Sequence, residues 1–188
     1  MYIKKNKEHM KSVCIFCGSK SGTKKEYADN ARALGLLFVK NNIAMIYGGA
    51  TNGIMGIIAD TMMENGGKVI GVIPTLIADR ELAHMNISEL HVVASMSERK
   101  TKMIELADAF ITLPGGVGTM DEMFEVLAFT HLGVNAKPVG VLNVNGYYNH
   151  MLQFIDHAVA EDFIPHRVKE QIVIDPDPER LLQKMRLS

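Results

Sequence analysis

The stretch AFITLPGGVGTMDE, residues 109–122, decides the fold of this 188-residue chain. Its first part, Ala109–Leu113, is a continuous apolar run, which predicts a strand buried on both faces of a sheet. A glycine-rich turn follows, and the apolar spacing of Thr119–Leu132 predicts a helix. A strand that passes through a tight turn into a helix is half of a βαβ unit, so the stretch indicates a parallel sheet.

The rest of the chain repeats this alternation on both sides of the stretch. Further strands are predicted at Val13–Cys17, Ile43–Tyr47, Lys68–Ile73, His91–Ala94, Pro138–Val144 and Ile172–Ile174. Further helices are predicted at Lys24–Asn41, Ile54–Asn65, Met96–Ala107, Tyr147–Glu161 and Pro178–Met185. Strands that alternate with helices of this length predict one α/β domain, a doubly wound parallel sheet flanked by helices. We assign residues 12–188 to this domain and residues 1–11 to a flexible N-terminal arm.

The composition excludes several classes of protein. Hydrophobic residues make up 47% of the chain, which is ordinary for a compact globular domain and too many for a disordered one. Lysine and arginine number 20 against 21 acidic residues, so no general positive field favours nucleic acid or a membrane surface. No apolar run approaches the roughly 20 residues of a membrane span, and none follows the basic N-terminus as in a signal peptide. We therefore expect a cytoplasmic protein.

The two cysteines, Cys14 and Cys17, form a C-x-x-C motif. They lie three residues apart on a predicted strand, so their side chains point to opposite faces and cannot easily form a disulfide or share a metal. The histidines show no cluster with ligand spacing either. We expect buried thiols in a reducing compartment and no metal site.

Two glycine-rich loops follow predicted strands, at Gly48–Gly53 and at Gly115–Gly118. The first is no P-loop, because Ile54 stands where lysine is required, and the second lacks the last glycine of a dinucleotide fingerprint, since Asp121 occupies that position. Such loops bring backbone N–H groups and a helix N-terminus to a phosphate, or they are simply tight turns with positive φ. Two loops on one sheet edge favour a phosphorylated small molecule.

Acidic residues follow the second loop at once. Thr119 and Glu122 have the spacing of a capping box, which would place negative charge in the first turn of the helix. A phosphate would then lie against the Gly115–Gly118 backbone and the Thr119 hydroxyl, with the Glu122 carboxylate facing the next part of the ligand, such as a sugar. Spacing alone leaves Glu122 as either a cap or a catalyst.

A second concentration of charge lies at Ser95–Lys100. Ser95 and Glu98 form another capping box, so a helix is predicted to begin at Met96. Arg99 and Lys100 then lie near the helix start, where they either reach a ligand at the sheet edge or cover the core with their aliphatic stems. Glu81 belongs to a polar loop and by itself reads as a solvated acid.

Several of these motifs together resemble one known family. They are Cys17-Gly18-Ser19, Tyr47-Gly48-Gly49, Gly71-Val72-Ile73-Pro74, Glu98-Arg99-Lys100, residues 114–122, Lys137-Pro138-Val139-Gly140 and residues 143–148. The pair P-G-G-x-G-T-x-x-E and E-R-K is far more specific than either glycine loop. The chain resembles the LOG ("lonely guy") family, long described as possible lysine decarboxylases, from about Ser12 nearly to its end.

The resemblance implies a Rossmann-like fold, a homodimer with sites near the subunit interface, and a hydrolase without metal or organic cofactor. Such enzymes convert cytokinin riboside 5′-monophosphates to free base and ribose 5-phosphate, and related members resemble AMP nucleosidases. The match implies that Arg99 and Glu122 are the catalytic pair. It also implies that substrate is bound by Arg99 and Glu122 themselves and by Ser19, Glu81, Lys100, Gly115, Gly116, Val117, Gly118 and Thr119.

Alternatives and departures accompany this resemblance. The runner-up is a non-catalytic nucleotide or molybdenum-cofactor carrier of the same fold, against which the retention of both Arg99 and Glu122 argues. Lysine decarboxylation is weakest, because it needs pyridoxal phosphate on a Schiff-base lysine. The chain has Ser97 where the family often has histidine, and Ala128 and Phe129 where it commonly has threonine and tryptophan, a difference that would alter a wall of the site. We expect the chemistry and the recognition of phosphate to persist, and the sequence leaves the preference for the base open.

Overall fold

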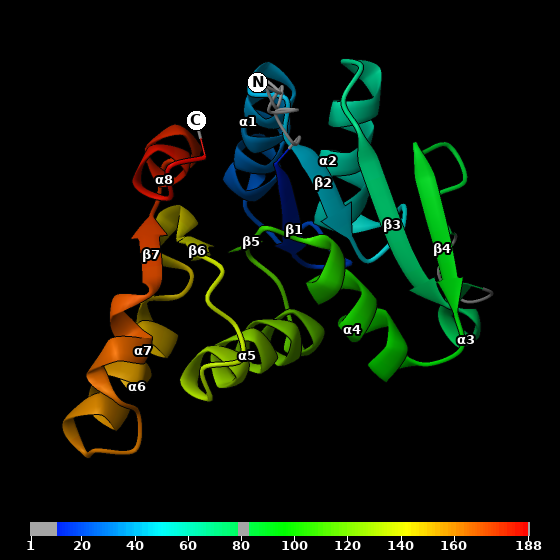
Figure 1. Ribbon diagram of the computed structural model, residues 1–188. Coiled ribbons are helices and arrows are strands. Elements are labelled where there is room, and N and C mark those ends of the chain that lie inside the picture. Colours follow the sequence, from blue (N-terminus) through cyan, green and yellow to red (C-terminus); the bar gives the residue numbers. More distant parts are fainter. Residues whose placement is uncertain (1–10, 79–82, 188) are drawn as a thin grey trace, which may run out of the picture.

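The computed structural model describes residues 11–78 and 83–187. Its centre is a seven-stranded, wholly parallel sheet with the strand order β4-β3-β2-β1-β5-β6-β7 (Figure 1). The strands are β1 (Ser12–Phe16), β2 (Ala44–Tyr47), β3 (Val69–Pro74), β4 (Glu89–Val93), β5 (Ala109–Thr112), β6 (Val139–Leu142) and β7 (Ile172–Asp175). The predicted doubly wound parallel sheet is confirmed, and each predicted strand is present.

Helices cover both faces of this sheet. One face carries α1 (Lys25–Lys40), α2 (Gly53–Glu64) and α8 (Pro178–Lys184), whereas the other carries α4 (Met96–Leu106), α5 (Val117–His131) and α6 (Asn149–Ala160) (Figure 1). Within the described residues, no helix is both long and apolar enough to span a bilayer.

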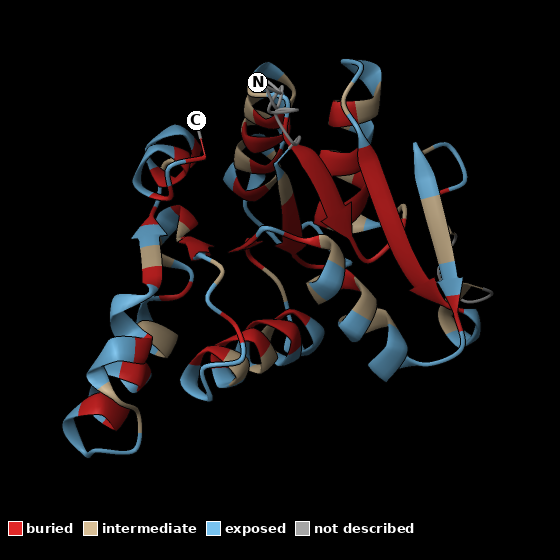
Figure 2. Ribbon diagram, viewed as in Figure 1, coloured by how far each residue is buried: buried red, intermediate tan, exposed pale blue. Residues whose placement is uncertain are grey.

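The apolar core is accordingly divided by the sheet into two clusters. Successive residues of a strand face opposite sides, so Val13 joins the cluster under α1 and α2 while Cys14 joins the cluster under α4 and α5. Figure 2 shows the resulting concentration of buried residues on the central strands and on the inward sides of the helices. Cys14 and Cys17 are both buried and free, one in each cluster, as predicted.

The order of the strands fixes where a ligand is expected. From β1 the chain winds outward through β2 and β3 to β4, then crosses back to place β5 on the other side of β1. The two loops that leave the carboxyl ends of β1 and β5 therefore diverge to opposite faces. A crevice opens at such a switch point, and ligands of open α/β sheets bind there.

Some short elements were not predicted. The four-residue α3 (Thr75–Ala78) and the five-residue α7 (His166–Glu170) are too short to show a helical period in the sequence. The helix predicted from Tyr147 begins only at Asn149, after the 3-10 turn η1 (Val144–Gly146). The arm assigned to residues 1–11 lies, up to residue 10, outside the described residues.

The end of β7 carries a carboxylate that contributes to stability. Asp175 is buried and accepts hydrogen bonds from Lys184 Nζ at 2.7 Å, Arg180 Nη2 at 3.1 Å and the Asp177 amide at 2.8 Å. Burial by itself raises the pKa of Asp175, but these partners outweigh it and lower the pKa to about 2.

We expect Asp175→Asn to lower the free energy of unfolding at pH 7 by about 1–2 kcal/mol, allowing for solvent around the two cations. A depressed pKa stabilises the fold above the carboxyl's unfolded value near 4, and this stabilisation disappears as the pH falls towards 2. Urea unfolding of both proteins at pH 7 and pH 3 measures the difference. Asp156→Asn, which removes an exposed ion pair with Lys169, is the control and should change little.

Candidate functional site

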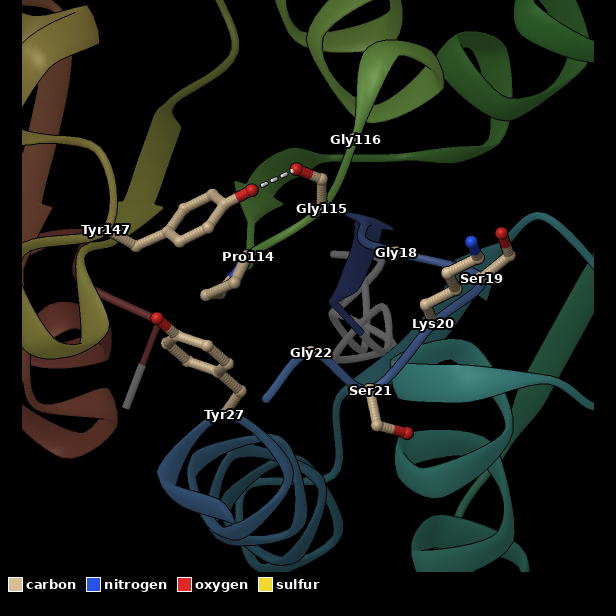
Figure 3. A pocket seen from close by; sticks show the side chains of 10 residues that line it. All are labelled: Gly18, Ser19, Lys20, Ser21, Gly22, Tyr27, Pro114, Gly115, Gly116 and Tyr147. Atoms are coloured by element: carbon tan, nitrogen blue, oxygen red, sulfur yellow. Dashed lines mark hydrogen bonds between the residues drawn. The ribbon is translucent and has the colours of Figure 1, made fainter. Parts of the chain in front are cut away.

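A cavity of about 380 Å³ opens at the switch point between β1 and β5 (Figure 3). Its walls are the loop after β1, Gly18–Gly22, the loop after β5, Pro114–Gly116, and the rings of Tyr27 and Tyr147. The two loops are joined by a hydrogen bond from the Gly18 amide to the Pro114 carbonyl at 3.1 Å. Of the described residues that line the cavity, Lys20 alone carries a charge, so the site offers a net positive potential to an anion.

The N-terminus of α5 opens beside this cavity. The helix begins at Val117, its N-cap Gly116 makes no side-chain hydrogen bond, and the first bond along the axis runs from the Met120 amide to the Gly116 carbonyl at 3.1 Å. The amides of Val117, Gly118 and Thr119 therefore have no partner within the helix. Such amides, together with the helix dipole, form an anion site.

The predicted capping box at Thr119 and Glu122 is wrong. The helix starts two residues before Thr119, so Glu122 lies in its second turn and the first turn contains no acidic residue. Thr119 is buried with its hydroxyl packed against Gly115, which places this hydroxyl beneath the loop rather than at its surface. The negative charge that the sequence places in the first turn therefore lies in the second turn instead.

The glycines of this second loop serve two different purposes. A Cβ on Gly115 would overlap the Thr119 hydroxyl and would lie 2.8 Å from the Gly18 nitrogen, so close packing requires glycine there. A Cβ on Gly116 or Gly118 would meet no described residue within 4 Å, and neither glycine has positive φ. Packing against the described residues therefore does not explain these two glycines, and their backbone is open to the close approach of a ligand.

The first loop, by contrast, is a tight turn. Gly49 and Gly53 have φ of 77° and 60°, a conformation that favours glycine. The amides of Ile54 and Met55 at the start of α2 both point to the Gly18 carbonyl, at 3.1 and 3.4 Å. This helix N-terminus thus supports the loop after β1, and the amides of Ile54 and Met55 are not offered to a phosphate.

Arg99 from α4 and Glu122 from α5 meet in a buried ion pair. Arg99 Nη2 lies 3.1 Å from Glu122 Oε1, and the two side chains are only 12% and 8% exposed. Burial raises the pKa of Glu122 to about 7, although the Arg99 charge acts in the opposite direction. A carboxyl that changes its charge near neutral pH, one helical turn beyond an anion site, has the properties of a catalytic group.

The predicted binding residues are divided between the cavity and the Arg99–Glu122 pair, which does not line the cavity. Ser19 lines the cavity, and its side chain extends next to that of Lys20 (Figure 3). Lys100 instead forms ion pairs with Asp121 and Glu125, each at 3.2 Å. Burial acts to lower the pKa of Lys100, but these hydrogen bonds outweigh it and raise the pKa. Glu81 lies outside the described residues.

Sequence reasoning missed the aromatic residues that hold the second loop in place. The Tyr147 hydroxyl donates to the Gly115 carbonyl at 2.6 Å, and the Tyr148 hydroxyl donates to the Leu113 carbonyl at 2.7 Å. Tyr147 also meets Tyr27 edge to face, with 5.6 Å between ring centroids. The pair Tyr147-Tyr148, just after the predicted strand Pro138–Val144, is the available signal, but the predicted helix Tyr147–Glu161 includes both residues, whereas α6 begins at Asn149.

Ala128, expected to form a wall of the site, lies elsewhere within this chain. It is exposed and lines an apolar groove of about 390 Å³ with Phe124, Phe163 and their neighbours. Phe129 is half-buried on the other side of α5. Ala128 could therefore contact a ligand in the cavity only if another molecule, bound at the groove, brought the two together.

Known proteins are similar to this chain over nearly its whole length. A family model described as "Possible lysine decarboxylase" matches residues 55–185. A probable cytokinin riboside 5′-monophosphate phosphoribohydrolase of Oryza sativa subsp. japonica is 47% identical over 92% of this chain and 69% of its own length. A cytokinin riboside 5′-monophosphate phosphoribohydrolase of Arabidopsis thaliana is 44% identical over 95% of this chain and 83% of its own length.

Solved structures give the same fold at lower identity. The molybdenum cofactor carrier protein of Chlamydomonas reinhardtii matches with a TM-score of 0.72 and 18% identity, over 94% of this chain and 97% of that protein. The molybdenum cofactor binding protein of Rippkaea orientalis matches with a TM-score of 0.72 and 19% identity, over 95% and 97% of the two chains. At these identities the likeness concerns the Rossmann-like fold alone.

Proposed function

The chain belongs to the family described as possible lysine decarboxylases, which includes the cytokinin riboside 5′-monophosphate phosphoribohydrolases, and on this basis we propose that it hydrolyses nucleoside 5′-monophosphates. The substrate is adenosine 5′-monophosphate, plain or modified at N6. The bond that breaks is the N-glycosidic bond, and the products are the free base and ribose 5-phosphate.

One observation carries the proposal: unpaired amides at the start of α5 lie one helical turn before a buried carboxylate that ionises near pH 7. The amides of Val117, Gly118 and Thr119, with Ser19 and Lys20 opposite, would hold the 5′-phosphate. A ribose attached to that phosphate extends towards Glu122 and Arg99. Binding energy from the phosphate then helps to orient the reacting carbon, which is remote from it.

Cleavage of the glycosidic bond develops positive charge on the ribose, as in other glycoside hydrolyses. The electron pair of the C1′–N bond leaves with the base, and the oxygen of a water molecule forms the new bond to C1′. An ionised Glu122 stabilises the cationic sugar or accepts the proton of the attacking water, while the base gains a proton. Arg99 favours the charged form of Glu122, because a neighbouring cation lowers the pKa of a carboxyl and so opposes the effect of burial.

Lysine decarboxylation, which the family's description suggests, does not fit the residues present. A Schiff-base lysine must lose its proton, and enzymes achieve this by lowering its pKa. Lys100 is the lysine beside the Arg99–Glu122 pair, and its two carboxylate partners raise its pKa instead.

We further propose that the protein acts as a homodimer through the face that carries the apolar groove. Phe124, Leu132 and Phe163 expose 37%, 69% and 82% of their surfaces there. A large apolar patch of this kind is typical of an interaction surface. Size-exclusion chromatography with light scattering should give twice the mass of the 20.8 kDa chain, and Phe163→Asp should shift the mass towards the monomer.

A chromatographic assay tests the proposed reaction. Purified protein is incubated with AMP or with N6-isopentenyl-AMP, and free base and ribose 5-phosphate are quantified together. Equimolar release of both products supports the hydrolase, and the ratio of the two rates identifies the preferred base. Binding of either nucleotide without release of base would contradict the proposal and favour the carrier instead.

A further inference from the structure

We infer that Gly48 is a positioning residue for Arg99, because its missing side chain leaves the space that the guanidinium occupies beside Glu122. The inference rests on the proposed hydrolysis and concerns the same site. Gly48 directly follows β2, on the opposite side of β1 from β5 and its glycine loop. The residue is buried, and it is not one of the residues that line the cavity.

The space at Gly48 is filled by the atom that reaches Glu122. A Cβ built on Gly48 would overlap Arg99 Nη2 and would lie 3.2 Å from Arg99 Cζ. Nη2 is the same nitrogen that lies 3.1 Å from Glu122 Oε1. A methyl group at residue 48 therefore cannot coexist with the ion pair as it stands.

Backbone conformation offers no competing reason for glycine here. Gly48 does not have positive φ, in contrast to the neighbouring Gly49 at 77°. The remaining close neighbour of the added Cβ is Met55 Sδ at 3.1 Å, in a flexible side chain that can shift by a few tenths of an ångström. The Arg99 guanidinium, at the far end of a flexible side chain, is thus the group that has to shift.

Arg99 has few other contacts to hold its guanidinium in place. Its Nη1 lies 3.9 Å from Met96 Sδ, a weak acceptor, and its buried Nε has no hydrogen-bond partner among the described residues. If the guanidinium is displaced from Glu122, no neighbouring acceptor among the described residues holds it close to the carboxylate. The position of the catalytic cation depends on a residue that carries no functional group.

The charges around Glu122 give this inference a signature beyond lost activity. The charged groups that act on Glu122 are Arg99 and Lys100 from α4 and Asp121 and Glu125 from α5. Glu122 in turn raises the pKa of the buried thiols of Cys14 in β1 and Cys17 just after it. Arg99 has the larger effect of the two cations, and it lowers the pKa of Glu122. Moving Arg99 away must therefore raise the pKa of Glu122 above its value of about 7.

The experiment compares Gly48→Ala with wild type and with Gly35→Ala. Gly35 is also buried and also lacks positive φ, but a Cβ there meets its nearest neighbours at 3.4 Å, an ordinary contact. We expect Gly48→Ala to remain folded and to lower kcat by about a hundredfold, with KM changed by less than about threefold. The Gly35→Ala variant should keep the wild-type rate.

Two readouts separate positioning of Arg99 from a general structural role. Added to Arg99→Ala, the Gly48→Ala change should cause no further loss of kcat, because it acts through a group that is already absent. A carboxyl titration of Glu122 by NMR should give a higher pKa in Gly48→Ala than in wild type. Additive losses, or an unchanged Glu122 pKa, would overturn the inference. If wild type itself releases no base, the proposed function fails, and the titration still decides the role of Gly48.

Discussion

Glu122→Gln should lower kcat for release of the base by about a thousandfold while the nucleotide still binds. Glutamine keeps the shape of the side chain but has no charge to stabilise a cationic ribose and no basic oxygen to accept a proton from water. Phosphate binding at the start of α5 does not involve this side chain, so affinity should change little. Single-turnover product release and calorimetric titration with AMP measure the two quantities separately.

The pH dependence of the same variant tests the state of the carboxyl. Because the pKa of Glu122 is raised to about 7, we expect kcat/KM of wild type to fall about tenfold per pH unit below that value. The Glu122→Gln variant has no group to protonate, so this limb should be absent from its residual activity. Retention of the limb would assign it to another residue.

Stability gives an independent check with a defined sign. The native pKa of Glu122 lies above its unfolded value of 4.5, so the carboxyl favours folding at acidic pH and loses this contribution as the pH rises through about 7. Glutamine abolishes that dependence. Glu125→Gln, one turn further along the same helix and paired with Lys100, is the matched control and should keep its rate. A Glu122→Gln variant that loses stability but keeps its rate would reduce Glu122 to a structural partner of Arg99.

The strands of the sheet were predictable from the sequence because each strand is marked by its own apolar run. Runs such as Ala109–Leu113 are apolar throughout, and burial on both faces demands this wherever the run lies in the sheet. The Arg99–Glu122 pair was not predictable from spacing, since α4 and α5 meet only through the crossover that places β5 beside β1. The family resemblance supplied the pair, and the structure supplies its geometry.

The error at Thr119 has the same origin. The Thr119–Glu122 spacing satisfies a capping box, but the tight turn brings Gly115 against the Thr119 hydroxyl and starts the helix at Val117. The Glu122 carboxylate forms an ion pair with Arg99 instead of capping the helix. The box at Ser95 and Glu98 has no such competitor, and there the Ser95 hydroxyl does accept from the Glu98 amide, at 3.1 Å.

The second large effect is expected for a substitution in the second glycine loop, Gly115–Gly118. Gly118→Ala should leave the protein at least as stable as wild type, because alanine in the first turn of a helix is favoured over glycine by up to about 1 kcal/mol and its Cβ meets none of the described residues within 4 Å. Nucleotide affinity should fall about a hundredfold, since a methyl group then stands among the amides offered to the phosphate.

Gly115→Ala, three residues earlier, should have a different effect, because it lowers the stability of the protein. Its Cβ would overlap the buried Thr119 hydroxyl and approach the Gly18 nitrogen at 2.8 Å, so the loops after β1 and β5 must separate for the chain to fold. We expect a loss of about 2 kcal/mol or more in the free energy of unfolding, from strain in a packed turn. Thermal unfolding and AMP titration of both variants make the comparison. If Gly118→Ala binds AMP as tightly as wild type, the phosphate does not lie on these amides, because the added methyl group would stand among them.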